Sequence, residues 1–398
     1  MTSNPRMPSD PDNLSPSSFS FEHWRRLLPL FICTAAWGMV TVMLGPLLPA
    51  LTTRWQLQDA QAGTLFTAFF VGQLVGAWFA TRNLRLSLLF GAALSAAGTV
   101  ALAWTGFHAA HLALFAAGFG LSLGITAGNV LAGTATAHRA RALALFNVSW
   151  SLGAIACPAL VHLCGAGNTH LFFFITAAFV LVGGLSIATL SRDLTAPRQT
   201  ETSPALKSLL PLPLPLLALF ATSMLLYLGN ENSLGGWIPS FAARNSSALT
   251  ASTIALLFWL SEFIGRILMS TLLRHISEAA LYRISLPVLL FTQAALLLVP
   301  HPPRAVILSA TVLTGLSLAP VYPLLVAFLL ERTGRHPRLG QLFALASLGG
   351  ASLPWLTGVV STHFRSLRVG LLVPMAGILL LLLLTPGILP DRPSRQQS

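Results

Sequence analysis

Charged residues are scarce in this chain. Only 9% of its 398 residues are charged, whereas 54% are hydrophobic, and the mean hydropathy is +0.74. A soluble domain carries about 25% charged residues. Apolar runs of about 20 residues, long enough to cross a lipid bilayer, recur along the whole sequence. The composition excludes an ordinary soluble protein and indicates an integral membrane protein with many spans.

Lysine and cysteine are nearly absent as well. The single lysine, Lys207, follows Leu206, so the chain lacks the Gly-Lys-Ser/Thr ending of the phosphate loop in an ATP-driven pump. Cys33, Cys157 and Cys164 lie in apolar runs and show no metal-ligand spacing. We therefore expect neither an enzyme nor a bound metal or cofactor.

The 23 basic residues are distributed unevenly around the apolar runs. If the chain is threaded as twelve spans, seventeen of them lie on one side, Arg266 lies within a span, and five lie on the other side. Those five are Arg54, Arg244, Arg304, Arg365 and Arg368. The positive-inside rule predicts that both termini are cytoplasmic. We expect the membrane to be a bacterial inner membrane. Because the charges are spread over short loops and form no stripe, nucleic-acid binding is not expected.

Twelve apolar runs predict an all-α membrane protein of twelve transmembrane helices in two six-helix bundles. The runs cover 27–51, 61–81, 86–106, 111–136, 142–164, 171–190, 212–242, 251–273, 281–300, 305–330, 339–362 and 369–389. The expected domains are a disordered cytoplasmic tail (1–22), an N-terminal bundle (23–190), a polar cytoplasmic linker (191–208), a C-terminal bundle (209–390) and a cytoplasmic tail (391–398). We expect a monomer in the lipid bilayer.

Three short motifs recur in the same order in both halves of the chain. Residues 44–49 match 234–239 at an offset of 190, residues 120–123 match 315–318 at an offset of 195, and residues 151–153 match 347–349 at an offset of 196. Each match is weak alone, because Leu, Gly and Ser are abundant here. Their nearly constant spacing predicts one six-helix unit used twice, as in some transporter folds.

The seventh run contains a carboxylate, Glu231, between two asparagines. A charge at bilayer depth costs about 3 kcal/mol even on the mildest insertion scale, so such a residue usually has a task inside a cavity. The same run carries Gly235, Gly236 and Pro239, which weaken a helix. We therefore predict a helix broken near Gly235 and Gly236 that lines a transport pathway.

With these residues in place, the chain resembles the major facilitator superfamily, and within it the sugar-permease-like branch that includes the fucose permease. The resemblance rests on Tyr227-Leu228-Gly229, Glu231 and Gly235-Gly236-Trp237 in run seven, Asn147, Gly153 and Pro158 in run five, Trp259 and Gly265-Arg266 in run eight, and Pro320 with Pro323 in run ten. Two features depart from it. The acidic gate residue expected after the second helix is missing between Gly76 and Arg82, and Asn129 stands where the fucose permease has a carboxylate in its fourth helix.

The resemblance implies that runs one, four, seven and ten line a central cavity, with runs five, eight and eleven beside them. The predicted substrate-binding residues are Glu231, Asn230, Trp237, Tyr227, Asn129, Asn147, Trp150, Gln73 and Tyr322. Amide groups and tryptophan can hydrogen-bond hydroxyls and stack on the apolar face of a sugar ring. Alternatively, such asparagines only hold membrane helices together.

Glu231 has three possible roles: a contact to substrate or gate, a proton site, or a structural group. Tyr227 is four residues earlier and shares its helix face, while Asn230 and Trp237 share another face. Glu262 and Arg266 stand at i and i+4 in run eight, which predicts an intrahelical ion pair with a structural or gating role. Expected hinges are Gly45, Pro46, Gly235 and Gly236.

These features together predict a secondary transporter of a small polar solute, in particular a sugar, that works by alternating access. It would be either facilitative or coupled to a proton. The alternative is an efflux transporter of amphipathic compounds or drugs, which the many aromatic residues also fit. A membrane sensor or scaffold is disfavoured, because the sequence has no extramembrane domain with which to signal.

Overall fold

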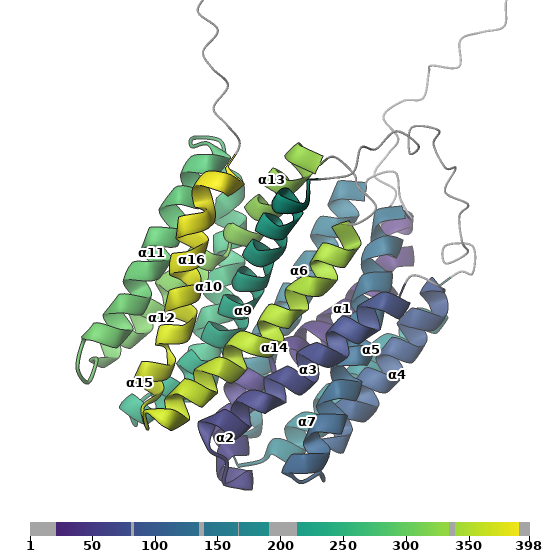
Figure 1. Cartoon of the computed structure of the whole chain (residues 1–398). Helices are drawn as coiled ribbons and strands as arrows, with labels where there is room; N and C mark the ends of the chain where they lie inside the picture. Colours follow the sequence, from purple (N-terminus) through teal and green to yellow (C-terminus); the bar gives the residue numbers. More distant parts are fainter. Residues whose placement is uncertain are drawn as a thin grey trace, which may run out of the picture.

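The computed structural model describes residues 21–80, 83–134, 139–165, 167–190, 213–333 and 339–389. These residues fold into helices joined by short loops (Figure 1). Residues 1–20 of the expected N-terminal tail, the linker 191–208 and the tail 391–398 lie outside the described residues.

The helices fall into two sets along the chain, which we call the N-terminal and C-terminal halves. The N-terminal half contains α1 (Phe21–Val42), α2 (Leu44–Trp55), α3 (Asp59–Phe79), α4 (Leu84–Ala101), α5 (Phe107–Thr134), α6 (Arg139–Cys164) and α7 (Thr169–Ala188). The C-terminal half contains α9 (Leu214–Asn245), α10 (Ala251–Leu272), α11 (Glu278–Leu298), α12 (Arg304–Leu318), α13 (Val321–Thr333), α14 (Leu339–His363), α15 (Leu367–Gly370) and α16 (Leu372–Ile388).

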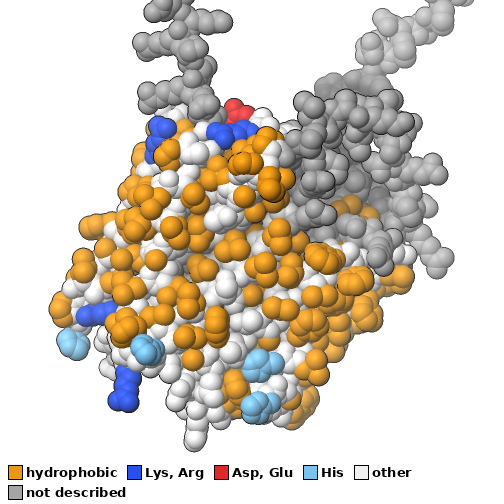
Figure 2. All heavy atoms as spheres, in the orientation of Figure 1, with side chains coloured by type: hydrophobic (Ala, Val, Ile, Leu, Met, Phe, Trp, Pro, Cys, Tyr) orange, Lys and Arg blue, Asp and Glu red, His pale blue; other side chains and the backbone are white. Residues whose placement is uncertain are grey.

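Eleven spans in the described residues are long and apolar enough to cross a membrane. They become twelve if α1 and α2, which are bent by 46° at Met43, count as one broken span. Large apolar side chains such as Leu163, Leu185 and Phe291 are exposed on the outside of the bundle. Figure 2 shows such side chains over the middle of one face, with arginines at its upper and lower ends. The predicted all-α membrane fold is therefore confirmed.

The helices run between two ends of the bundle. One end is where α7 stops, α9 starts and α16 stops (Figure 1). We call it the terminal end. The opposite end carries the turns after α2, α9 and α14, and we call it the loop end. The cytoplasmic location of the terminal end stays a prediction from the basic residues.

The predicted break in run seven is wrong, because α9 is one helix of 32 residues that passes through Gly235, Gly236 and Pro239. Both glycines are packed, Gly235 against Trp259 and Gly236 against Phe66, and this packing offsets their weak helix propensity.

The break lies instead in the first span. The ring of a proline clashes with the carbonyl of residue i−4. For Pro46 that residue is Val42, where α1 ends. By the same rule, Pro323 in α13 clashes with the carbonyl of Ala319, one of the two residues between α12 and α13.

Matching glycines make the same close contact in both halves. A Cβ atom added at Gly153 of α6 would lie 1.8 Å from the carbonyl oxygen of Ala35 in α1. In the C-terminal half, a Cβ at Gly349 of α14 would lie 1.9 Å from the carbonyl oxygen of Leu225 in α9. The fifth span thus packs on the first as the eleventh packs on the seventh, which agrees with a six-helix unit used twice. The exact domain boundaries stay a prediction.

Candidate functional site

The site is built on α10, which crosses α6 between the two halves. Trp259, Glu262 and Arg266 recur at a spacing of three and four residues, so α10 presents them on one face. A charged residue in an apolar helix is stable only when it is paired, and Arg266 forms the predicted ion pair with Glu262 one turn earlier.

Arg266 also contacts a second carboxylate, on a different helix. Its Nη2 atom lies 3.7 Å from Oε1 of Glu231 in α9. The hydroxyl of Tyr227, one turn earlier in α9, donates a hydrogen bond of 2.6 Å to the same oxygen. The side chains of Glu231 and Glu262 are only 9% and 2% exposed, whereas Arg266 is 28% exposed. One arginine therefore compensates two buried carboxylates, and we call these four residues the charged cluster.

The charged cluster also reaches the N-terminal half. Nη1 of Arg266 donates a hydrogen bond of 3.3 Å to Oγ of Ser151 in α6. The guanidinium lies 5.5 Å from the ring centroid of Trp150, a distance at which a cation is attracted to an aromatic face. Trp150 in turn donates to Thr41 of α1 at 3.3 Å. Arg266 thus connects the two halves near the middle of the bundle.

Aromatic rings lie beside the charged cluster on both sides. Trp150 and Trp259 pack edge to face with centroids 5.9 Å apart, one from each half. Tyr227 stacks on Tyr322 of α13 with centroids 5.3 Å apart. The whole chain contains only three tyrosines, and two of them are in this pair. Such rings can pack against the apolar face of a small solute.

Two polar atoms of α10 are buried without a hydrogen-bond partner among the described residues. They are the indole N–H of Trp259, a donor, and Oε2 of Glu262, an acceptor. Leaving a buried polar group unpaired costs about 1–3 kcal/mol. Because the two residues are three apart on one helix, they share a face and offer a donor and an acceptor together.

Three other predicted site residues lie in α3, α5 and α6 without a hydrogen bond to the charged cluster. Asn129 and Asn147 each donate to a carbonyl of their own helix, of Ile125 at 3.1 Å and of Leu143 at 2.9 Å. Asn147 is exposed and Asn129 half-buried. The side-chain nitrogen of Gln73 is buried and has no partner among the described residues. Their contact with a solute stays a prediction.

Asn230 and Trp237 are fully buried and hydrogen-bond within their own half, and the ring of Trp237 also lies 6.4 Å, centroid to centroid, from that of Phe66 in α3 of the other half. Nδ2 of Asn230 donates to the carbonyl of Leu226 at 2.8 Å, and its amide lies against Gly377 of α16. Trp237 donates from its indole to the carbonyl of Pro354 in α14 at 2.9 Å. The structure therefore gives both side chains a role in helix packing, and their predicted substrate contact stays untested.

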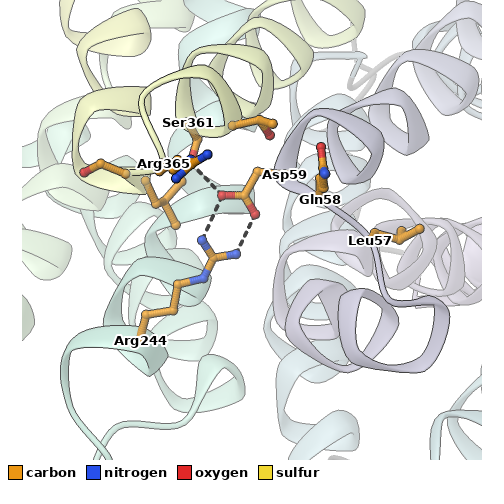
Figure 3. A pocket seen from close by; sticks show the side chains of 9 residues that line it. Leu57, Gln58, Asp59, Arg244, Ser361 and Arg365 are labelled. Carbon is orange, nitrogen blue, oxygen red and sulfur yellow. Dashed lines mark hydrogen bonds and ion pairs between the residues drawn. The ribbon is translucent and has the colours of Figure 1, made fainter.

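The sequence reasoning missed a second charged contact, at the loop end (Figure 3). Asp59, the first residue of α3, forms a bidentate ion pair with Arg244 of α9. The two guanidinium nitrogens of Arg244 lie 2.6 and 2.8 Å from the two carboxylate oxygens. Ser361 of α14 donates to the same carboxylate. This contact, which we call the latch, joins the N-terminal half to two helices of the C-terminal half. One feature of the sequence could have pointed to this contact. Acidic residues are rare, and Asp59 is one of only eleven aspartates and glutamates in the chain.

Small residues let the halves approach closely between the charged cluster and the latch. A Cβ at Gly45 of α2 would lie 2.4 Å from the carbonyl oxygen of Gly235 in α9. At Gly63 of α3, a Cβ would lie 2.8 Å from the Cα of Trp355 in α14. The predicted hinges Gly45, Pro46 and Gly235 therefore lie at or beside the crossing of α2 and α9. Their movement stays a prediction.

Two helical halves that meet around a buried charged cluster define a membrane transporter of the two-bundle type. The comparison with protein families agrees, because the family model described as Major Facilitator Superfamily matches residues 30–339. The chain belongs to this superfamily, whose members are transporters rather than enzymes. It is therefore a transporter that works by alternating access.

Individual relatives are distant in sequence. The chain is 22% identical over 383 residues to Bypass of stop codon protein 6 of Saccharomyces cerevisiae, covering 84% of this chain and 77% of that protein. The crystal structure of a mutant of the nucleoside transporter NupG matches with a TM-score of 0.71 at 14% identity, over 92% of this chain and 100% of that one. A bacterial homolog of the human lysosomal transporter Spinster, in an inward-facing and occupied conformation, matches with a TM-score of 0.69 at 15% identity, over 94% and 97%. These structures share the fold.

Proposed function

We propose that this transporter carries a small polar solute, in particular a sugar or related polyol, which binds beside the charged cluster. The observation that carries the proposal is the unpaired donor of Trp259 next to the unpaired acceptor of Glu262. A hydroxyl group both donates and accepts, so one hydroxyl, or two neighbouring ones, would satisfy both atoms. The resemblance to the sugar-permease-like branch supports the same class of solute.

The aromatic rings support a solute with an apolar face. A sugar ring presents C–H groups on one side and hydroxyls around its edge. The C–H side would pack against Trp150 and Trp259, which come from different halves. A solute held there would touch both halves, as alternating access around a central site requires.

We further propose that a proton drives transport through Glu231. Two carboxylates share one arginine, so the charged cluster carries one excess negative charge when both are ionised. Glu262 is the closer partner of Arg266, and Glu231 is the one left less compensated. A proton on Glu231 would neutralise the cluster and weaken its pull on Arg266, which also holds Ser151 of the other half. Proton binding would thereby act on a side chain that contacts both halves.

Uptake into proteoliposomes tests the solute class. The panel should hold hexoses, pentoses, polyols, nucleosides and a hydrophobic cationic dye. Nucleosides belong in it because a nucleoside transporter shares this fold. We expect saturable uptake of a sugar or polyol, reduced at least tenfold in Trp259→Phe, which keeps the ring and removes the donor. Transport of nucleosides alone, or extrusion of the dye without any effect of sugars, would overturn the sugar proposal. The dye result would establish the efflux alternative.

The monomeric state, the bacterial inner membrane and the cytoplasmic position of both termini belong to the same proposal. The asymmetric distribution of arginines supports the orientation. Under this orientation the latch lies on the outer side, and the described conformation is closed on that side.

A further inference from the structure

Two adjoining pockets open at the loop end. The first, of about 370 Å³, lies around the latch and is lined from both halves (Figure 3). The second, of about 360 Å³, shares Arg244, Arg365, Ser366 and Leu367 with it. The remaining residues of the second pocket are Phe241, Asn245, His301 and Arg368. We call this second pocket the basic pocket, and the transport cycle proposed above does not use it.

The lining of the basic pocket is strongly cationic. It contains three arginines and a histidine but no acid. Asp59, on the wall of the first pocket, is already engaged by Arg244 and Ser361. With one carboxylate set against three guanidiniums, the two pockets together carry an excess of two positive charges. These arginines are three of the five that the threading of the sequence puts on this side of the membrane.

The arginines differ in what holds them. Arg244 is engaged by Asp59, and Arg368 donates to the carbonyl of Val299. Arg365 is exposed, and among the described residues its side chain has no hydrogen-bond or ion-pair partner, while its backbone N–H donates to the carbonyl of Thr362. Its backbone is left-handed, with φ at 51°, a conformation that disfavours side chains other than those of Gly, Asn and Asp. An unpaired guanidinium is therefore held beside two partnered ones.

We propose that the basic pocket binds an anionic oxygen group, a carboxylate or a phosphate. The planar fork of arginine matches two oxygens of such a group and forms short, charge-assisted hydrogen bonds with them. The volume lies within the range of small-molecule sites and exceeds what a single halide fills. Ser366 and Asn245 add neutral polar groups to the wall. The anion comes either from solution or from the phosphate of a lipid headgroup.

Occupancy of this site would act on the latch. Arg244 belongs to both pockets, so an anion that hydrogen-bonds to it competes with Asp59. An anion that weakens the latch favours separation of the halves at the loop end, and opening in turn favours the anion, because such coupling is reciprocal. The anion would thereby regulate opening without being the transported solute.

Calorimetric titration of the purified full-length protein with inorganic phosphate tests the site without any transported solute. Sodium chloride at matched ionic strength corrects for screening. We expect saturable binding to the wild type, weakened about tenfold in Arg365→Gln, the loss expected for a charge-assisted contact. Arg304→Gln is the matched control, because Arg304 is exposed at the same end and lines neither pocket. Arg365→Lys should fall between wild type and Arg365→Gln.

A second arm separates the two sources of the anion. The wild type and Arg365→Gln are placed in nanodiscs with and without phosphatidylglycerol, and retained lipid is detected by native mass spectrometry. Lipid retained by the wild type and lost in Arg365→Gln assigns the site to a headgroup, whereas phosphate binding without retained lipid assigns it to a soluble anion. If neither probe binds, or if Arg304→Gln loses binding as much as Arg365→Gln, the proposal is overturned. None of these outcomes depends on the sugar proposal.

Discussion

Arg266 is shared by Glu231 and Glu262, and this sharing sets the electrostatics of the site. Removing one partner of a buried ion pair typically costs about 3–5 kcal/mol, because the remaining charge is left unpaired. Removing both partners together costs much less, since no uncompensated charge remains. Comparing single and double variants therefore separates the stabilisation that comes from the ion pair from the cost of leaving one buried charge unpaired.

Stability measurements on Arg266 variants make use of this difference. We expect Arg266→Gln to lower the melting temperature in detergent strongly, because Glu231 and Glu262 are then both uncompensated. The double variant Arg266→Gln/Glu262→Gln should regain part of that loss, because only Glu231 is then left uncompensated, and neither variant should transport. If the double variant is as unstable as Arg266→Gln, the arginine stabilises the fold by packing rather than by charge.

The pH dependence of uptake tests Glu231 as the proton site. For a proton symporter, uptake by the wild type rises as the pH on the solute side falls. We expect Glu231→Gln, which mimics the protonated carboxyl, to lose this dependence while it still binds the solute. Glu278→Gln, an exposed carboxylate at the start of α11, is the control. A pH response retained in Glu231→Gln and lost in Glu262→Gln would transfer the proton to Glu262.

Local spacing explains which of these contacts the sequence could predict. Tyr227 with Glu231, and Glu262 with Arg266, are four residues apart, so a helix alone brings them together. The contacts of Arg266 with Glu231 and Ser151 join residues 35 and 115 positions apart, and the packing of three helices decides them. For the same reason the sequence could not show that Trp237 donates its hydrogen bond to Pro354 of its own half.

At the scale of the helix, the crossing of α2 and α9 decides how closely the halves can approach. The sequence singled out Gly45 and Gly235, which lie at this crossing, but assigned the break to the wrong helix. The glycines and the proline in the sequence show where a helix has low intrinsic stability. Packing against neighbouring helices nevertheless keeps α9 continuous. Its glycines serve close packing instead of a bend.

Alanine substitutions can separate gating glycines from packing glycines. A methyl group at Gly45 meets the backbone of the opposite half, so the clash exists only while the loop end is closed. Overpacking costs about 1–3 kcal/mol, and we expect Gly45→Ala to shift the population toward a loop-end-open state. The measurement is labelling of Thr67→Cys by a membrane-impermeant maleimide in a background without native cysteines. Thr67 bonds to Ala351 across the halves and is part-buried.

Gly153→Ala is the matched control for this experiment. The clash at Gly153 is with Ala35 of the same half, so it is present in every conformation. This variant should lose thermal stability without a gain in labelling at position 67. Equal labelling in Gly45→Ala and the wild type would show that the α2–α9 crossing does not limit opening.

At the scale of the whole molecule, the fold followed from composition and periodicity, because a bilayer leaves few solutions to an apolar chain of this length. The contacts between the two halves could not be predicted from composition and periodicity. The latch joins Asp59 to residues 185 and 302 positions away, and no local pattern indicates which arginine an acid at a span end will meet. A site between two bundles is thus the part of a transporter that a single sequence discloses least.

The latch predicts how the equilibrium between closed and open states responds to charge. Arg244 is 45% exposed and Asp59 11%, so solvent screens the pair and its contribution is on the order of 1 kcal/mol. We expect Asp59→Asn to raise the loop-end-open population about fivefold. Spin labels at Gln56→Cys and Ser247→Cys, both exposed and on opposite halves, report the distance across the loop end. The longer component of the distance distribution should be about five times larger in the variant than in the wild type.

The charge-swapped variant Asp59→Arg/Arg244→Asp tests whether attraction is the cause. It recreates the pair with its sign reversed, so the longer component should shrink again. Arg304→Gln, which removes a positive charge at the same end without touching the latch, should leave the distances unchanged. If Asp59→Asn keeps the wild-type distribution, the loop end is held by the packing of α3 on α14 around Gly63 and Gly358 alone. Gly63→Ala would then open it where Asp59→Asn does not.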